Sequence, residues 1–385
     1  MSGFHNISTK GSIVGSEAKG RVPPPGNGVP GSSRFVSMPS SVGEVSVVAS
    51  PASCASAPSV PSTVETAVRP RPTPKTDSTK VPEVAKRRIV AVGGGKGGIG
   101  KSLITSSLGI SLARRGFRVV VIDADLGGAN LHNAVGISTP NVTLADFIHH
   151  RVDDMNEVII DTGIPNLGLI SGAHDFLTAA NLKYFQKTRL LNRIRKLEAD
   201  FVLLDIGAGI SFNIVDFFLL SEVGLLVAVP EPSSIEGAYR FLKMSFYRHL
   251  WAGLKGAGTA RGVIEQAMDQ KNQKGIRTPY DLLEAVVRED EEAGQLLKEQ
   301  AQKFRPRLLV NQVRFPEDRH LGNSMASVCR KHLGVDIDCL GAITYDDGVW
   351  KANRKKMPFM LTNPDSETAR SIDGAATRLL SLFQN

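Results

Sequence analysis

The chain has 385 residues, of which 42% are apolar, and a formal net charge of +8 at pH 7. That length allows one large or two modest domains with a buried core, and the modest charge permits attraction to nucleic acid or an anionic membrane without requiring either. The three cysteines, Cys54, Cys329 and Cys339, are odd in number and form no C-x-x-C pair, which indicates reduced thiols in a cytosol rather than a disulfide framework.

Residues 1–84 differ in composition from the rest of the chain. They hold twelve of its 21 prolines and are otherwise dominated by Ser, Val, Gly, Ala and Thr. Such a segment buries too little apolar surface to offset its ordering entropy, so we predict a disordered tail before one folded domain over residues 85–385. The first thirty residues lack the apolar segment of a signal peptide, and a run of ~18 apolar residues occurs nowhere. We therefore expect neither secretion nor a membrane span.

The stretch GGGKGGIGKS, residues 93–102, is the most informative motif of the chain. It satisfies G-x-x-x-x-G-K-[ST] with Gly95, Gly100, Lys101 and Ser102, and it lies between an apolar run and an apolar-periodic segment. Strand, loop and helix in this order are the context in which the motif indicates a phosphate-binding loop. The sequence therefore predicts a nucleotide site here.

Each residue type in this loop has a chemical role. Glycines permit positive φ and bring backbone N–H groups close to phosphate oxygens, where a Cβ would intrude. Lys101 supplies a cation for the β- and γ-phosphates, and the Ser102 hydroxyl supplies a ligand for Mg²⁺. A second lysine, Lys96, is not required by such a loop, and its flanking glycines allow it to point toward a phosphate on another subunit. The other loop residues expected at the nucleotide are Gly97, Gly98, Ile99 and Leu103.

Beyond the loop, apolar strand-like runs alternate with helical segments, which indicates an α/β fold. We predict a doubly wound, mostly parallel sheet with helices on both faces. A long, charge-rich segment from about 245 to 304 breaks the alternation and is predicted as a helical insertion. The strands predicted after the loop are residues 118–123, 167–171, 201–205, 224–229, 307–311 and 339–343.

Three aspartates and a glycine follow predicted strands. Asp123 and Asp125 close the second strand, and Asp205 ends FVLLD. Ligands of an open parallel sheet bind beyond the carboxyl ends of its strands, so these side chains are expected beside the loop. Asp205 is placed to hold Mg²⁺ through water, and the Gly207 N–H is free to meet a γ-phosphate and to lose that contact on hydrolysis. Each aspartate alone is consistent with a helix N-cap, but with the loop they indicate one site.

The string K-G-G-x-G-K-[ST], from Lys96 to Ser102, resembles the deviant Walker A motif of the MinD/ParA superfamily of dimerising P-loop ATPases. DADLGGAN resembles switch I and DIGAGIS resembles switch II of its MinD and FlhG types. The resemblance covers nearly all of residues 88–385 and is nearest the FlhG type, which regulates flagellar number. It implies that Lys96 reaches the partner's ATP in a face-to-face dimer and that Asp125 positions the attacking water.

The same resemblance implies roles for four further residues. Asp123 and Asp205 organise the Mg²⁺ shell, and Asn130 contributes near the dimer interface. Asn311, in LLVNQV, is similar to the family's adenine-reading asparagine, and an asparagine after a strand is as often a turn residue. With ATP and Mg²⁺ as cofactors, the activity implied is a slow, partner-stimulated hydrolysis of ATP to ADP and phosphate.

We therefore predict an ATP-dependent, dimerising switch that positions a structure such as a flagellum, a division site or a chromosome. ATP would order both switches and favour the dimer, and hydrolysis would release it. The expected partners are a second copy and an activating or landmark protein, with nonspecific DNA or peripheral membrane contact as further options. The expected location is the cytoplasm, including the periphery of the membrane or nucleoid.

Two segments bear on whether the protein would contact DNA or a membrane. Residues 181–198 predict a helix with cations on one side, which is either a DNA-binding patch or, as we favour, an ordinary solvated face. The C-terminal segment, residues 366–385, has an apolar stripe that predicts a packed final helix rather than a membrane anchor. The cations are Lys183, Lys187, Arg189, Arg193 and Lys196, the apolar side chains opposite them are Leu182, Phe185, Leu191 and Ile194, and the C-terminal stripe is Ile372, Ala376, Leu379, Leu380 and Phe383.

Four alternatives differ in the residues that they require. A DNA-partitioning ATPase of the ParA type uses surface lysines and arginines to hold nonspecific DNA. An iron–sulfur cluster carrier needs paired thiolates at a dimer axis, which the cysteine spacing does not favour. A bacterial tyrosine kinase shares the loop type, but its tyrosine-rich tail is missing because Tyr345 is the last tyrosine. A scaffold that binds nucleotide without turnover is distinguished by assaying phosphate release.

Overall fold

The computed structural model describes residues 87–125, 128–172, 184–254, 258–268, 275–276 and 278–384. All of them belong to one compact unit, Thr76–Asn385. The predicted tail over residues 1–84 and Cys54 lie outside the described residues, as do Leu126 and Gly127 of the predicted switch I.

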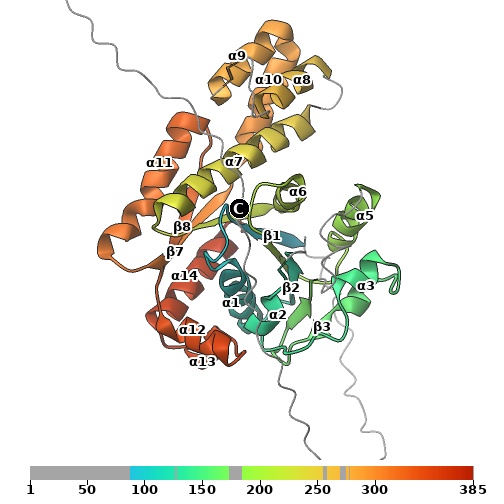
Figure 1. Cartoon of the computed structure of the whole chain (residues 1–385), viewed down its shortest axis with the longest axis vertical. Coiled ribbons are helices and arrows are strands. Elements are labelled where there is room, and N and C mark those ends of the chain that lie inside the picture. The colour runs from blue at the N-terminus through green and yellow to red at the C-terminus, as the bar shows by residue number, and fades with distance from the viewer. Residues whose placement is uncertain are drawn as a thin grey trace, which may run out of the picture. The chain divides into compact units, whose positions relative to one another are not determined.

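The core of the described unit is an eight-stranded sheet in the order β3-β4-β2-β5-β1-β6-β7-β8. Every pairing is parallel except that of the two-residue edge strand β3 with β4. This confirms the predicted mostly parallel α/β sheet (Figure 1). The strands are β1 Arg88–Gly93, β2 Val119–Ala124, β3 Ile160–Asp161, β4 Leu167–Ile170, β5 Phe201–Ile206, β6 Val223–Ala228, β7 Arg307–Val313 and β8 Asp338–Thr344.

Helices follow most strands, as crossovers between parallel strands require. The short elements η1 and η2 are 3₁₀ turns at Met155–Val158 and Pro316–His320. The α-helices are α1 Lys101–Arg114, α2 Leu131–Ala134, α3 Leu144–Ile148, α5 Tyr184–Ile194, α6 Phe212–Leu220, α7 Pro232–Gly253, α8 Gly258–Met268, α9 Pro279–Glu289, α10 Glu291–Lys303, α11 Leu321–Leu333, α12 Asp347–Arg354, α13 Phe359–Thr362 and α14 Glu367–Ser381.

Two hydrophobic cores cover the two faces of the sheet. Successive strand residues point to opposite faces, so Ile89 and Ala91 of β1 belong to the core that includes α6 and α7, while Val90 and Val92 belong to the core that includes α1 and α14. All six residues of β2 and of β5 are buried. Burial on both faces explains why these strands read as continuous apolar runs.

Most described residues of the predicted insertion are helical. Its start is not a boundary, because α7 runs without a break for 22 residues across the predicted start at 245. The end of α7 packs with α8 and α10, and α9 packs against both of these helices (Figure 1). Phe246 of α7 contacts Phe304 at a centroid distance of 5.5 Å, and Leu282 and Leu297 are fully buried beside them. The segment therefore has a core continuous with that of the sheet.

The C-terminal stripe packs inside the protein, as predicted. Helix α14 lies against α1 and β8, and Ile372, Ala376 and Leu379 are completely buried. Phe383 contacts the ring of Phe201 at 5.8 Å. Within the described ranges, no helix combines the length and the hydropathy that crossing a bilayer requires.

Candidate nucleotide-binding site

The glycine-rich loop connects β1, in the middle of the sheet, to the N-terminus of α1. Gly100 caps this helix with φ of 90°, a conformation that favours glycine. A Cβ on Gly95 would lie 2.0 Å from the Gly237 carbonyl oxygen of α7, so the loop is packed backbone against backbone. A Cβ on Gly97 or Gly98 would meet nothing within 4 Å, and both residues line a cavity. The loop is therefore anchored on one side and open on the other.

Two side-chain amides of β7 hold the loop from the neighbouring side. Asn311 Nδ2 donates to the Ile99 carbonyl at 2.8 Å, and Gln312 Nε2 donates to the Gly98 carbonyl at 3.1 Å. Adjacent residues of a regular strand would point to opposite faces. Here the pairing of β7 with β8 shifts between Val310 and Val313, and Gln312 has φ of 57°. This irregularity turns both amides toward the loop.

Asp123 and Asp205 form a buried carboxylate pair at the ends of adjacent strands. They are paired in register, and each is 2% exposed or less. Asp123 accepts backbone N–H bonds from Asp125 at 3.1 Å and Leu131 at 2.9 Å. Burial, followed by the charge of Asp205, raises the pKa of Asp123 to about 8. Burial also raises the pKa of Asp205 to about 6, although a hydrogen bond from Ser102 opposes the change.

Asp125 lies closer to the surface than the Asp123–Asp205 pair, next to the segment that follows β5. A Cβ built on Gly207 would lie 3.1 Å from Asp125 Oδ1, so the carboxylate lies close to the Gly207 backbone and leaves little room for a side chain there. Asn130 Nδ2 donates to the Gly128 carbonyl at 2.8 Å and thereby closes the turn after β2. The two predicted switch segments are therefore in contact with each other.

A cavity of about 720 Å³ opens beside the loop. Its phosphate end is formed by the loop, Lys101 and Ser102, and its other end by β8 and α12. At that second end Trp350 is 59% exposed, with the Arg354 guanidinium 4.8 Å from its ring. The lining also includes Leu103, Asp125, Asn130, Asn311, Gln312, Tyr345 and Val349.

Lys96 does not line this cavity. Its Nζ lies 2.7 Å from Glu231 Oε2 and 2.9 Å from Ser233 Oγ, at the N-terminus of α7. The pair is exposed, with 40% of the Lys96 side chain and 56% of the Glu231 side chain accessible to solvent. The second lysine of the loop is therefore turned away from the cavity that Lys101 faces.

The structure brings most of the predicted site residues together. Gly95 packs on Gly237 and the Ile99 side chain is 2% exposed with its carbonyl bound to Asn311, so at these two positions the predicted nucleotide contact falls to the backbone N–H groups. Asp123, Asp205 and Gly207 lie behind the cavity rather than in its lining. The sequence interpretation missed Gln312, Trp350, Glu231 and Ser233. A carboxylate directly after β6 was the available signal for Glu231, since this edge binds the ligand.

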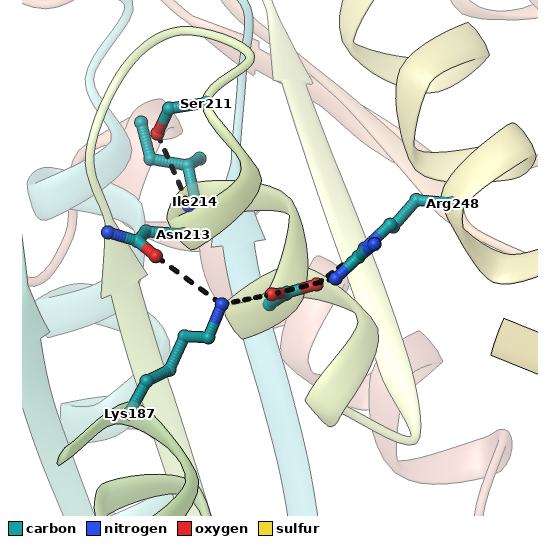
Figure 2. Close-up of polar contacts among 6 residues, drawn as sticks. Lys187, Ser211, Asn213, Ile214 and Arg248 are labelled. Carbon is teal, nitrogen blue, oxygen red and sulfur yellow. Dashed lines mark hydrogen bonds and ion pairs between the residues drawn. The ribbon is translucent and has the colours of Figure 1, made fainter. Parts of the chain in front are cut away.

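Two cations of the predicted row on α5, Lys187 and Arg189, contact other parts of the protein. Lys187 continues the buried stripe of Leu190, Ile194 and Leu197, and its Nζ lies 2.5 Å from Asp216 of α6. Arg248 of α7 approaches the same carboxylate from the other side at 3.0 Å, so three helices meet there (Figure 2). Lys183 lies outside the described residues.

Two other expectations for α5 are modified by the structure. Arg189 lies over the Phe147 ring at 4.4 Å and pairs with Asp153, whereas Arg193 and Lys196 are exposed. We predict Phe185 on the buried side, but it is 61% exposed, because the helical repeat places it on the face of α5 opposite Leu190 and Ile194.

The two described cysteines do not offer paired thiolates. Cys329 is buried in α11, and burial raises the pKa of its thiol to about 12. Cys339 lies on β8, where burial also raises the pKa of its thiol. A thiol that stays protonated is a poor metal ligand.

The carboxylate pair predicts a specific pH dependence of stability. The pKa of Asp123 is about 8 in the folded protein against an ordinary value of 3.8, so between these values the folded state holds more protons and stability falls as pH rises. We expect the melting temperature of the nucleotide-free protein to fall from pH 5 to pH 8. Asp205→Asn should make this fall shallower, because it removes a charge that raises the pKa of Asp123. Equal slopes in thermal melts of both proteins would contradict the coupling.

Comparison with known proteins places this geometry in a family. The CobQ/CobB/MinD/ParA nucleotide binding domain matches residues 90–359. The antiactivator FleN of Pseudomonas aeruginosa is 26% identical over 295 residues, which cover 76% of this chain and 86% of FleN. The flagellum site-determining protein YlxH of Helicobacter pylori is 32% identical over 165 residues, which cover 41% of this chain and 53% of YlxH.

A solved structure shows the same fold. The septum site-determining protein MinD of Pyrococcus horikoshii, complexed with Mg-ADP, matches with a TM-score of 0.50 and 20% identity over 77% of this chain and 97% of that one. At this identity the likeness concerns the fold alone. The family match, by contrast, spans most of the described unit. The chain therefore belongs to the CobQ/CobB/MinD/ParA family of nucleotide-binding proteins.

Proposed function

We propose that this chain is an ATP-dependent switch that dimerises on ATP and positions a cellular structure. The observation that carries the proposal is the direction of Lys96, which binds Glu231 and Ser233 and does not line the cavity that Lys101 lines. A lysine turned away from its own phosphate site is available to a phosphate of another subunit. The names of FleN and YlxH, an antiactivator and a flagellum site-determining protein, support positioning as the task.

The cavity is suited to a nucleoside triphosphate. The loop offers backbone N–H groups and Lys101 offers a cation to the polyphosphate. At the other end, Trp350 and Tyr345 present aromatic surface on which a purine can stack. The volume of about 720 Å³ is within the range of small-molecule sites. We therefore infer that ATP lies along the cavity with its phosphates on the loop.

The donor set at the phosphate end fits Mg²⁺. The Ser102 hydroxyl and the Asp205 carboxylate are hydrogen-bonded neighbours, and oxygen donors are what Mg²⁺ binds. Mg²⁺ keeps waters and phosphate oxygens as ligands, so it needs few protein groups; the described residues contain no cluster of three or more His, Cys, Asp or Glu suited to a metal. When bound, it would neutralise charge on the phosphate oxygens. Ser102 would hold it, and Asp205 would bind its waters.

Asp125 and Asp123 have different roles in this proposal. Asp125 reaches the cavity and is placed to orient the water that attacks the γ-phosphate. Asp123 binds the backbone of Asp125 and Leu131 with its two oxygens, so it fixes the segment that carries Asp125. Because Gly207 contacts the Asp125 carboxylate, loss of the γ-phosphate would release both segments together.

Glu231 and Ser233 retain Lys96 until a partner arrives. An exposed ion pair contributes at most about 1 kcal/mol, so the contact is easily exchanged. A triphosphate on a second subunit carries more negative charge than one carboxylate and can replace Glu231 as the acceptor. Dimer formation then couples Lys96 to the partner's ATP, and hydrolysis weakens the dimer by removing that phosphate.

Substitution of Lys96 and of Asp125 should have opposite effects on the dimer. Lys96→Ala should still bind ATP through Lys101 and Ser102 but remain monomeric, because the cation between the subunits is lost. Asp125→Ala should accumulate as an ATP-loaded dimer, because only the group that orients water is removed. Size-exclusion chromatography with light scattering, in ATP and in ADP, measures both masses.

Controls make this comparison decisive. Lys101→Ala should lose ATP binding by calorimetry and remain monomeric in every nucleotide. Glu231→Gln should dimerise at a lower ATP concentration than the unmodified chain, because Lys96 is released. Equal masses of the Lys96 and Asp125 variants in ATP would mean that Lys96 does not act between subunits.

Asn311 can be tested as a support of the loop. Its amide donates to Ile99, so Asn311→Ala should lower affinity for ATP and for GTP by the same factor, about fivefold for a lost hydrogen bond of about 1 kcal/mol. Gln312→Ala should behave in the same way. Calorimetry with both nucleotides gives the answer, and a loss confined to ATP would show instead that Asn311 reads adenine.

A further inference from the structure

A second cavity, of about 460 Å³, lies between α7, α9, α10 and α11, and we call it the basic-rimmed groove. Its floor is apolar: Phe246, Leu250 and Leu297 are each 2% exposed or less. On its edge, Tyr280 is 75% exposed, the most exposed of the large hydrophobic side chains in the described residues. The groove is formed mainly by the helices between β6 and β7, and it shares no lining residue with the nucleotide cavity.

The charged side chains that line the groove are all basic. Four basic residues line it, and no aspartate or glutamate does. Arg330 is paired with Asp336 at 2.7 Å, but Lys298 and Lys331 form no ion pair with any described residue. The basic residues are Lys298, Arg330, Lys331 and His332. The groove is therefore complementary to a ligand that is apolar where it enters the floor and negatively charged at its edges.

The geometry points to a short segment of a partner protein as the occupant, one that combines Asp or Glu with large apolar side chains. We propose that the basic-rimmed groove docks such a segment, as amphipathic peptides dock in apolar grooves. The chain's own residues 1–86 do not match this chemistry, since they carry nine Lys and Arg against five Asp and Glu. A flat bilayer does not match it either, because the apolar floor is buried and lies below the rim.

Helix α7 connects this groove to the loop. Its first turns carry Ser233, which binds Lys96, and Gly237, which packs on Gly95; its later turns provide Phe246 and Leu250 to the floor of the groove. The 22 residues of the helix span about 33 Å. A docked segment thus contacts the same rigid element that holds the loop. The groove does not depend on the dimerising function proposed above, because its charge and shape are independent of the nucleotide.

The test uses a random 12-residue peptide library displayed on phage and panned on the full chain. Recovered peptides should be enriched in Asp or Glu together with Leu, Ile, Phe or Trp. Measured by fluorescence anisotropy with a labelled peptide, the double variant Lys298→Glu/Lys331→Glu should weaken binding at least tenfold, and Tyr280→Ala should weaken it measurably. Lys303→Glu is the matched control: like Lys331 it lies in the last turn of its helix, but it does not line the groove, so affinity should be unchanged.

Each other outcome contradicts the proposal. Recovery of no peptide, of peptides without acidic enrichment, or of peptides that bind the double variant and the unmodified chain equally would show that the groove is not such a docking site. Thermal melts of all variants exclude unfolding as the cause of a loss. Sedimentation with phosphatidylglycerol vesicles that is abolished by the double variant would assign the rim to a membrane. Self-association in light scattering, abolished by the same variant, would assign it to a second copy.

Discussion

The burial of two carboxylates, Asp123 and Asp205, side by side at the ends of adjacent strands is the constraint on which the rest of the site depends. Two carboxylates at the ends of adjacent buried strands cannot both be charged without nearby cations or hydrogen-bond donors. Lys101 and the Ser102 hydroxyl act on Asp205, and two backbone N–H groups act on Asp123. The groups that stabilise the two carboxylates belong to the loop and to the segment after β2. The carboxylate pair therefore holds these two segments next to each other. It also leaves negative charge that a divalent cation with its nucleotide would balance.

Helix α7 gives this local site a connection to the rest of the molecule. Its first turns contact the loop at Lys96 and Gly95, Arg248 in its C-terminal part binds Asp216 of α6, and its end packs with the other helices of the insertion. Helix α6 starts directly after the segment that contains Gly207. Two structural connections therefore run from the site to α7, one through the loop and one through α6. Packed helices shift as units rather than deform, which suits such coupling.

The sequence predicted those features that depend on local pattern. Continuous apolar runs identified the central strands because both faces of this sheet are buried, and the glycine–lysine spacing identified the loop because its backbone geometry needs those residue types. The sequence did not predict contacts between residues that are far apart in the chain. The Lys187 ion pair and the two amides of β7 depend on helix placement and on a strand irregularity, which no periodicity reveals. Strand β3 was missed because two residues carry no pattern, and Phe185 was misplaced because it lies on the face of α5 opposite the buried stripe.

The proposed action of Lys96 on the ATP of the partner subunit can be tested most directly by mixing two inactive variants. Lys96→Ala keeps its own Asp125, and Asp125→Ala keeps its own Lys96. In a mixed dimer, the site on the Lys96→Ala subunit receives a lysine from its partner and has the aspartate that orients water. Phosphate release by the mixture should therefore rise well above the sum of the two variants measured separately, toward half the rate of the unmodified dimer. A rate equal to that sum at all mixing ratios would contradict action of Lys96 across the interface.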